Sequence, residues 1–195
     1  EYVDCAPNPD QCGGTGGCEG SVQWLGFNYT IGTGITTEKD YPYKGQDQKC
    51  KTASIKPVAG IKGYVRLPTN NYTMLMNAVA TIGPIAISAA AEPWQLYSSG
   101  VFSQNCGADV DHAIQTVGYG VVTKSNTTYW IVRNSWGASW GENGYIRIKR
   151  TGLKQPCKTD NTPGDGTGCA GGPKSVTVCG ECGMCGARAR ARARA

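Results

Sequence analysis

The chain has 195 residues, of which 17% are charged and 28 are glycine, and this composition is typical of a loop-rich globular protein. The net charge of +5 includes four arginines of the terminal run ARARARARA, without which it falls to +1, so a folded body that binds nucleic acid is not expected. No apolar run approaches the ~18 residues of a membrane-spanning helix, and no membrane association is expected.

Ten cysteines point to an oxidising compartment, because thiols in the cytosol are kept reduced. Three N-glycosylation sequences agree with this, and they begin at Asn28, Asn71 and Asn126. The sequence therefore predicts a lysosomal, vacuolar or secreted glycoprotein with several disulfide bonds.

The first third of the chain has little regular pattern. Residues 1–20 are rich in Cys, Gly and Pro and are expected to form a loop, whereas apolar residues at helical spacing predict a helix over residues 21–29. The break Gly32-Thr33-Gly34 is expected to end that helix, and the aromatic segment at 40–43 is expected to be extended.

Strand-forming runs dominate from residue 61 onward. One helix interrupts them, because Asn70 or Asn71 is a suitable N-cap and Leu75, Val79 and Ile82 form its expected inner face. Five segments have the β-rich or alternating pattern of strands: residues 61–67, 85–88, 114–122, 129–133 and 145–149.

These elements predict an α+β protein in which a small helical part precedes a mostly antiparallel sheet or barrel. We expect residues 1–60 to form the helical part and residues 61–157 to form the β-rich part. The Cys/Gly-rich segment 158–186 has too few apolar residues for a core of its own, so it must be stapled or mobile. The Ala/Arg tail, residues 187–195, is expected to be disordered.

The only histidine, His112, stands where an apolar, β-prone run begins, and Asn134 follows another such run. A lone histidine is most often a packing residue, but an imidazole that takes a proton from a thiol needs a partner that holds one tautomer. The amide oxygen of an asparagine does this by accepting the ring N–H on the far side. Trp136 and Trp140, in the same segment, either pack in a core or keep water from that hydrogen bond.

Six segments, in their order and spacing, resemble the papain-like cysteine peptidases, the cathepsins and their relatives. They are EYVDC, GCEG, EKDYPY, GPIAISAAA, VDHAIQTVGYG and RNSWGASWGENGYIRIKR, and the resemblance spans residues 1 to about 157. It implies a papain-like two-lobed fold, with a partial helical left lobe, an antiparallel β-barrel-like right lobe and an active site in the cleft between them. No cofactor and no metal is implied.

The resemblance also implies roles for individual residues. His112 would be the general base and Asn134 the residue that orients it. The substrate-binding positions would be Gly20 and Ser21 on the cleft loop, Ser88 at the floor of the P2 pocket, Val110 and Asp111 beside the substrate backbone and P2 side chain, Trp136 over the His–Asn pair, and Trp140 on the primed side.

The front of the chain departs from the family. None of the ten cysteines lies in a CGSCW-like motif that starts a helix, and the usual spacing of roughly 130 residues places the nucleophile before Glu1. The chain is therefore expected to be a fragment without the nucleophilic Cys and the oxyanion Gln, inactive alone. It would also lack the helix against which both lobes pack, and so expose an apolar face.

The resemblance implies two disulfides, Cys5–Cys50 and Cys106–Cys157, with upstream partners for Cys12 and Cys18. The spacing Cys179-x-x-Cys182-x-x-Cys185 superficially matches metal sites, but a fourth ligand is missing. A disulfide such as Cys169–Cys179 is favoured instead.

Two other functions remain open at this stage. The chain would be a catalytically dead homologue that acts as a binding or regulatory protein, or its C-terminal Cys cluster would be an interaction module. As a peptidase it would be a monomer whose partners are peptide or protein substrates, a propeptide and cystatin-like inhibitors.

Overall fold

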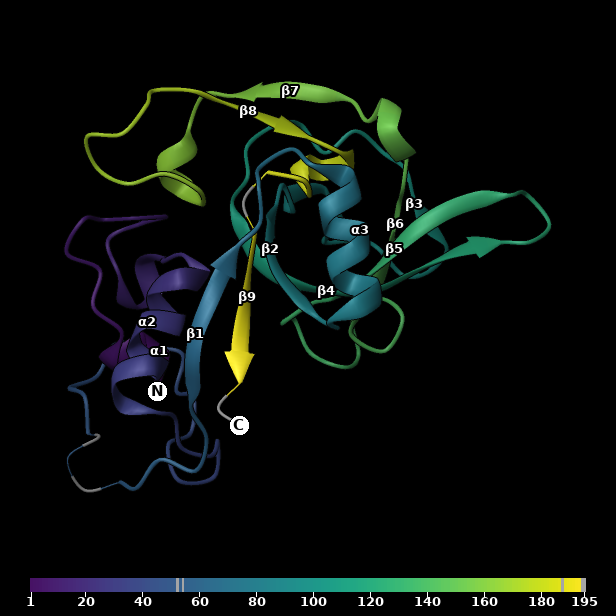
Figure 1. Cartoon of the computed structure of the whole chain (residues 1–195). Coiled ribbons are helices and arrows are strands. Elements are labelled where there is room, and N and C mark those ends of the chain that lie inside the picture. Colours follow the sequence, from purple (N-terminus) through teal and green to yellow (C-terminus); the bar gives the residue numbers. More distant parts are fainter. Residues whose placement is uncertain (52, 54, 187, 194–195) are drawn as a thin grey trace.

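A computed structural model describes residues 1–51, 53, 55–186 and 188–193 of the chain. Figure 1 shows a helical region that contains the N-terminus beside a larger β-rich region, with strands β1 and β9 between them. The expected α+β class, with a helical part beside a β-rich part, is therefore confirmed, and we call the two regions the left and right lobes. No helix in the described ranges is long and apolar enough to cross a membrane.

The left lobe is built on α1 (Tyr2–Cys5) and α2 (Gln23–Thr33). The sequence pattern missed α1, because four residues are too few to show helical periodicity. The α2 helix also continues through Gly32 and ends at Gly34, whose φ of 72° breaks the helix. The side chain of Glu1 ties this lobe together, since its carboxylate accepts hydrogen bonds from Tyr29 Oη (2.7 Å) and Thr36 N (2.9 Å).

The right lobe contains a seven-stranded sheet with strand order β1-β9-β2-β4-β5-β6-β3. All of its neighbouring strands are antiparallel except β3 and β6. Its strands are β1 (Ile61–Arg66), β2 (Ile85–Ala89), β3 (Val101–Phe102), β4 (His112–Val122), β5 (Thr127–Arg133), β6 (Tyr145–Lys149) and β9 (Arg188–Ala193). A separate hairpin pairs β7 (Cys157–Asp160) with β8 (Val176–Cys179).

Helix α3 (Tyr72–Thr81) covers the sheet with Leu75 and Val79, which are buried as expected. Ile82, the third residue of the expected inner face, is 48% exposed because the helix ends before it. The structure also decides between the two candidate caps. Asn71 accepts a hydrogen bond from Met74 N at 3.0 Å, whereas Asn70 binds the backbone of β8.

Short 3-10 helices lie in the connections between elements. They are η1 (Gly17–Glu19), between α1 and α2, and, in the right-lobe part of the chain, η3 (Glu92–Trp94), η4 (Gly152–Lys154), η5 (Pro163–Asp165) and η6 (Glu181–Gly183). The segment that holds η6 enters the right-lobe core, where Cys182, Met184 and Cys185 are at most 4% exposed. This segment is therefore packed into a core that other elements supply.

The expected disorder of the Ala/Arg tail is wrong for residues 188–193. The backbone of β9 pairs with both β1 and β2, because strand pairing is made by main-chain N–H and C=O groups and needs no particular side chain. Residues 187, 194 and 195 lie outside the described residues, so the expectation is not tested there.

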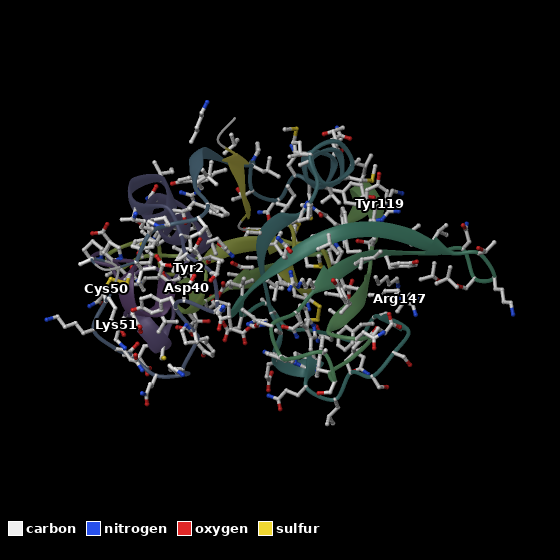
Figure 2. The ribbon with its side chains drawn as sticks, turned by 90° about the horizontal axis from the view of Figure 1, so that it is seen from below. Tyr2, Asp40, Cys50, Lys51, Tyr119 and Arg147 are labelled. Carbon is white, nitrogen blue, oxygen red and sulfur yellow. A yellow bond between two sulfur atoms is a disulfide. The ribbon has the colours of Figure 1, made fainter. Side chains whose placement is uncertain are left out.

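Four disulfides link the described cysteines, and only one of the expected pairs is among them. Cys5–Cys50 is confirmed, and Figure 2 shows Cys50 in the left lobe, far from Tyr119 and Arg147 of the right lobe. Cys106–Cys157, Cys169–Cys179 and an upstream partner for Cys12 are wrong. The observed pairs are Cys12–Cys169, Cys106–Cys182 and Cys157–Cys179.

The pairing changes because β7 and β8 form a hairpin. This hairpin sets Cys157 directly opposite Cys179, which uses both of these thiols locally and leaves Cys182 to reach Cys106. Cys179 and Cys182 are thus bound to sulfur, so they are not available as thiolate ligands for a metal.

Candidate active site

The start of strand β4 and the end of strand β5 together position the site. These strands are antiparallel neighbours, with Gln115 opposite Arg133, so the first residue of β4 lies beside the residue that follows β5. His112 and Asn134 occupy those two places. His112 Nε2 lies 2.8 Å from Asn134 Oδ1, which brings together two residues that are 22 positions apart.

The hydrogen bonds of Asn134 determine the tautomer of His112. Asn134 Oδ1 also accepts the backbone N–H of Ser135 at 2.8 Å. A backbone N–H can only donate a hydrogen bond, so the Asn134 atom that contacts both Ser135 and the His112 ring must be the amide oxygen. His112 Nε2 therefore carries the proton and donates it to Asn134. The other ring nitrogen, Nδ1, then has a free lone pair and is the basic atom.

Three tryptophans pack around this pair. The rings of Trp136 and His112 lie 5.2 Å apart and are tilted by 31°, while Trp94 meets the imidazole edge-on at 6.4 Å. Trp140 contacts Trp136 at 5.0 Å and packs against the right-lobe core. Asn134 is only 9% exposed, so its bond to His112 lies where few waters compete with it.

A tight turn explains the glycine of the second Trp-Gly pair. Asn134 N donates to Gly144 O at 2.9 Å, which closes the loop between β5 and β6. Gly141 has a φ of 56°, and a Cβ there would lie 2.6 Å from the carbonyl oxygen of Tyr145 and 3.0 Å from the Tyr97 ring. Only glycine fits this position, so the loop that carries both tryptophans keeps one shape.

A groove of about 520 Å³ lies in front of His112, between the two lobes. One wall is a loop of the left lobe, residues 12–20, which we call the glycine loop. The opposite wall is the start of β4, and a third set of residues comes from the connection between β7 and β8. The lining residues are Gly13, Gly14, Cys18, Glu19, Gly20, Ser21, Asp111, His112, Ala113, Asp165 and Gly166.

The glycine loop is folded around Asn8. The Asn8 side chain donates to the carbonyl oxygens of Cys12 (3.0 Å) and Gly14 (2.9 Å), and it accepts the N–H of Cys12 at 2.7 Å. Gly20 has a φ of 100°, and a Cβ there would overlap the Gly13 carbonyl oxygen. The loop therefore turns back on itself, and no side chain stands between Gly20 and the groove.

The expected substrate-binding residues divide into three groups. Gly20, Ser21 and Asp111 line the groove. Ser88 and Val110 are at most 1% exposed and are covered. Within the described part of the chain, Trp136 and Trp140 lie outside the set that lines this groove, and instead surround the His–Asn pair.

Asp111 positions His112. Asp111 N donates to Ala89 O (3.2 Å), and its carboxylate accepts the N–H of Ala91 (2.9 Å), so the turn before β4 is held to the end of β2. The Asp111 carboxylate therefore stabilises the backbone turn that precedes His112.

A second, smaller groove of about 310 Å³ lies behind the glycine loop, where α1 and α2 approach β2 and β4. Most of its lining is apolar, and Ser21 and Ala113 belong to both grooves. Its apolar side chains come from both lobes: Tyr2, Val3, Ala6, Val22, Phe27, Ala86 and Ala113.

Several residues of the site were missed by sequence reasoning. Asn8 and Trp94 carry no motif, because their partners come together only on folding. Gln23 also joins the lobes, since its side-chain amide donates to Ile87 O (2.8 Å) and to Ser88 Oγ (2.7 Å). A pairing between residues 64 or more positions apart leaves no local signal in a single sequence.

Comparison with known proteins identifies the class to which this fold and site belong. The model of the family described as "Papain family cysteine protease" matches residues 1–173, and the chain belongs to this family. The thiol protease SEN102 of Hemerocallis is 44% identical over 153 residues, which are 77% of this chain and 41% of that protein. The senescence-specific cysteine protease SAG12 of Arabidopsis thaliana is 41% identical over 77% of this chain and 42% of its own length.

Solved structures agree with the sequence relatives. The bromelain protease of Ananas comosus superposes with a TM-score of 0.76 at 32% identity, over 99% of this chain and 76% of that chain. The ragweed cysteine protease Amb a 11, in its proform, gives a TM-score of 0.76 at 30% identity, over 99% of this chain and 50% of that chain. The chain spans about two fifths of the length of the curated relatives described above.

Proposed function

We infer that this chain supplies the basic half of a cysteine-type peptidase active site that hydrolyses peptide bonds in proteins. The observation that carries the proposal is the 2.8 Å bond from His112 Nε2 to Asn134 Oδ1, which leaves Nδ1 free to take a proton. In the reaction His112 accepts the proton of a thiol as that thiol attacks the peptide carbonyl, and then returns a proton to the leaving amine. Asn134 keeps the ring in one orientation through both steps.

The thiol that fits this reaction is not Cys18. Cys18 lines the groove and forms no disulfide among the described residues. However, partial desolvation and the nearby carboxylate of Asp47 raise the pKa of the Cys18 thiol above its ordinary value. A catalytic cysteine needs the opposite shift, because the thiolate is the nucleophile.

The proposal therefore places the nucleophilic Cys and the oxyanion Gln on a segment encoded about 20–25 residues ahead of Glu1, and holds that this chain alone does not hydrolyse peptides. The apolar groove behind the glycine loop supports this. Its lining is mostly apolar and comes from both lobes, including Val22 and Phe27 of the left lobe and Ala86 of the right, which suits an apolar upstream segment packed between the lobes.

The test uses a thiol-reactive peptidyl probe. The 195-residue chain should show no inhibitor-sensitive labelling, whereas the protein with its upstream segment should be labelled and should lose that labelling in His112→Ala. Asn134→Ala should slow the labelling, and Asn134→Gln should restore part of the rate. Labelling of the 195-residue chain, or a Ser or Gly encoded at the upstream Cys position, would contradict the proposal.

The alternative of a dead homologue that binds a partner predicts that His112→Ala leaves function intact. The tautomer-specific pair argues for the peptidase, because a binding protein needs no oriented base. Two of the similar solved structures are a proform and a precursor, which supports a propeptide as a further partner. A cystatin-like inhibitor would occupy the same groove, and we expect a monomer.

A lysosomal, vacuolar or secreted location fits the surface chemistry. Asn28, Asn71 and Asn126 are all exposed, so each is open to glycan transfer, and four disulfides suit an oxidising compartment. Digestion with a peptide-N-glycosidase should increase the mobility of the natural protein by up to three glycan steps.

A further inference from the structure

The connection between β7 and β8 reaches across the molecule to the left lobe. Figure 1 shows it running from the right lobe to a position above the N-terminal helices. We call residues 161–172 the strap. Cys169 is bonded to Cys12, Ala170 N donates to Asp10 O (2.9 Å), and Gly13 N donates to Gly168 O (2.8 Å). The strap is thus attached to the glycine loop both covalently and by hydrogen bonds.

The same strap is seated on the right lobe a few residues earlier. Ser88 Oγ donates to Gly166 O at 3.3 Å, and Thr162 Oγ1 donates to Asp109 Oδ1 at 2.8 Å. Gly166 lies so close to Val110 that an added Cβ would overlap the Val110 carbonyl oxygen. The strap backbone therefore covers the Ser88 hydroxyl and the Val110 carbonyl, and Gly183 packs against the Val110 side chain, so that both residues are almost fully buried.

This cover changes the floor of the groove. The family resemblance implied a side-chain pocket bounded by Ser88 and Val110, whereas in the structure the groove meets Asp165 and Gly166 at that end. We propose that the strap fills this pocket, so that the site accepts a small side chain there, and that the Cys12–Cys169 disulfide keeps the strap in place. This rests on the proposed function, because it names the substrate class of that site.

The first test measures specificity in the protein with its upstream segment. Two peptides are compared that differ only in having Ala or Leu as the second residue before the scissile bond. We expect kcat/KM for the Ala peptide to exceed that for the Leu peptide by about tenfold or more, the usual size of such pocket effects. Cys12→Ser/Cys169→Ser should shift the ratio at least about tenfold toward Leu, while Cys5→Ser/Cys50→Ser, which removes a disulfide away from the strap, should not.

Two glycines of the strap provide a local control. Gly166→Ala must displace the strap from Val110 and should shift the ratio in the same direction. Gly164→Ala adds a Cβ that has no atom within 4 Å, so it should keep the wild-type ratio. Equal effects of the two substitutions would overturn the proposal.

Equilibrium binding separates this proposal from the proposed function. The same two peptides are titrated into the 195-residue chain without reductant, and binding is followed by tryptophan fluorescence. If the longer protein hydrolyses nothing, the proposed function fails. The proposal for the strap is still supported if the 195-residue chain binds the Ala peptide more tightly than the Leu peptide and Cys12→Ser/Cys169→Ser reverses this preference. A preference for Leu, equal affinities or no binding of either peptide overturns it.

Discussion

The right lobe buries a continuous set of apolar side chains whose members all come from Leu67 onward. Among the described residues of the left lobe, the buried apolar ones are few, namely Cys12, Val22, Tyr29 and Tyr41, and none of them belongs to that core. Disulfides, the Glu1 carboxylate and the Asn8 side chain hold the left lobe instead. The right lobe combines a packed core with the Cys106–Cys182 and Cys157–Cys179 disulfides, whereas the left lobe has no comparable core among its described residues and depends mainly on specific links.

This difference separates the two halves of the site. His112 begins β4 and Asn134 directly follows β5, both in the packed lobe, so their 2.8 Å contact depends little on the left lobe. The groove wall opposite them is a glycine loop whose shape depends on a few hydrogen bonds and one disulfide. We therefore expect the hydrogen bond between His112 and Asn134 to tolerate changes that deform the groove.

The largest effect should come from the right-lobe core. Leu75 is fully buried, so Leu75→Ala should lower the free energy of unfolding by about 2–5 kcal/mol through lost burial and a residual cavity. Leu25 is only partly buried in α2, so Leu25→Ala should cost at most about 1.5 kcal/mol. Urea denaturation followed by tryptophan fluorescence measures both, and equal losses would contradict the contrast between the lobes.

The next effect should fall on the left lobe alone. Cys5→Ser/Cys50→Ser opens a link between residues 45 positions apart, which should cost about 2–4 kcal/mol. Hydrogen exchange should show faster exchange of amides in α1 and α2, with unchanged protection in β4 and β5. Uniform loss of protection in both lobes would show that they unfold as one unit.

A smaller loss is expected when the glycine loop loses its central side chain. Asn8→Ala leaves the N–H of Cys12 and the carbonyl of Gly14 without their partner, at a cost of about 1–3 kcal/mol. Asn8→Asp keeps an acceptor for the Cys12 N–H but sets a carboxylate oxygen against the carbonyl oxygens of Cys12 and Gly14, so near neutral pH it should cost at least as much. Thermal unfolding compares the two variants, and a clearly smaller loss for Asn8→Asp would mean that the hydrogen bonds donated by Asn8 contribute little.

The smallest effect concerns acid stability at the rim of the right lobe. Hydrogen bonds from Arg147, at 2.6 and 2.8 Å, hold the pKa of the Glu142 carboxyl below its ordinary value. The folded protein therefore binds fewer protons than the unfolded one, and the contribution of Glu142 is present above the unfolded-state pKa of about 4.3 and lost as pH falls through the lower native value.

Glu142→Gln should consequently cost about 1 kcal/mol near neutral pH, since the pair is partly exposed, and the difference from wild type should shrink below about pH 4. Urea midpoints measured from about pH 3 to 7 provide the check. A constant difference over that range would show that the loss does not arise from the charge of Glu142.

Sequence patterns located most elements of the right lobe, because alternation and β-branched runs are local properties. They also indicated His112 and Asn134, since each stands at a strand end in a recognisable segment. They failed where the partner is distant or the element is short. Four residues of α1 carry no periodicity, and β9 pairs through its backbone although its Ala/Arg sequence contains none of the β-branched or aromatic residues that indicate a strand.

The sequence by itself determined the family and the α+β class, and it indicated His112 and Asn134 as the candidate pair. Only the tertiary structure decided which cysteines join, that the strap covers Ser88 and Val110, and which nitrogen of His112 is basic. The physical reason is distance along the chain. Cys12 and Cys169 are 157 residues apart, and their meeting depends on the path of every element between them. The strand patterns that place His112 and Asn134, in contrast, depend only on residues that are close together in the sequence.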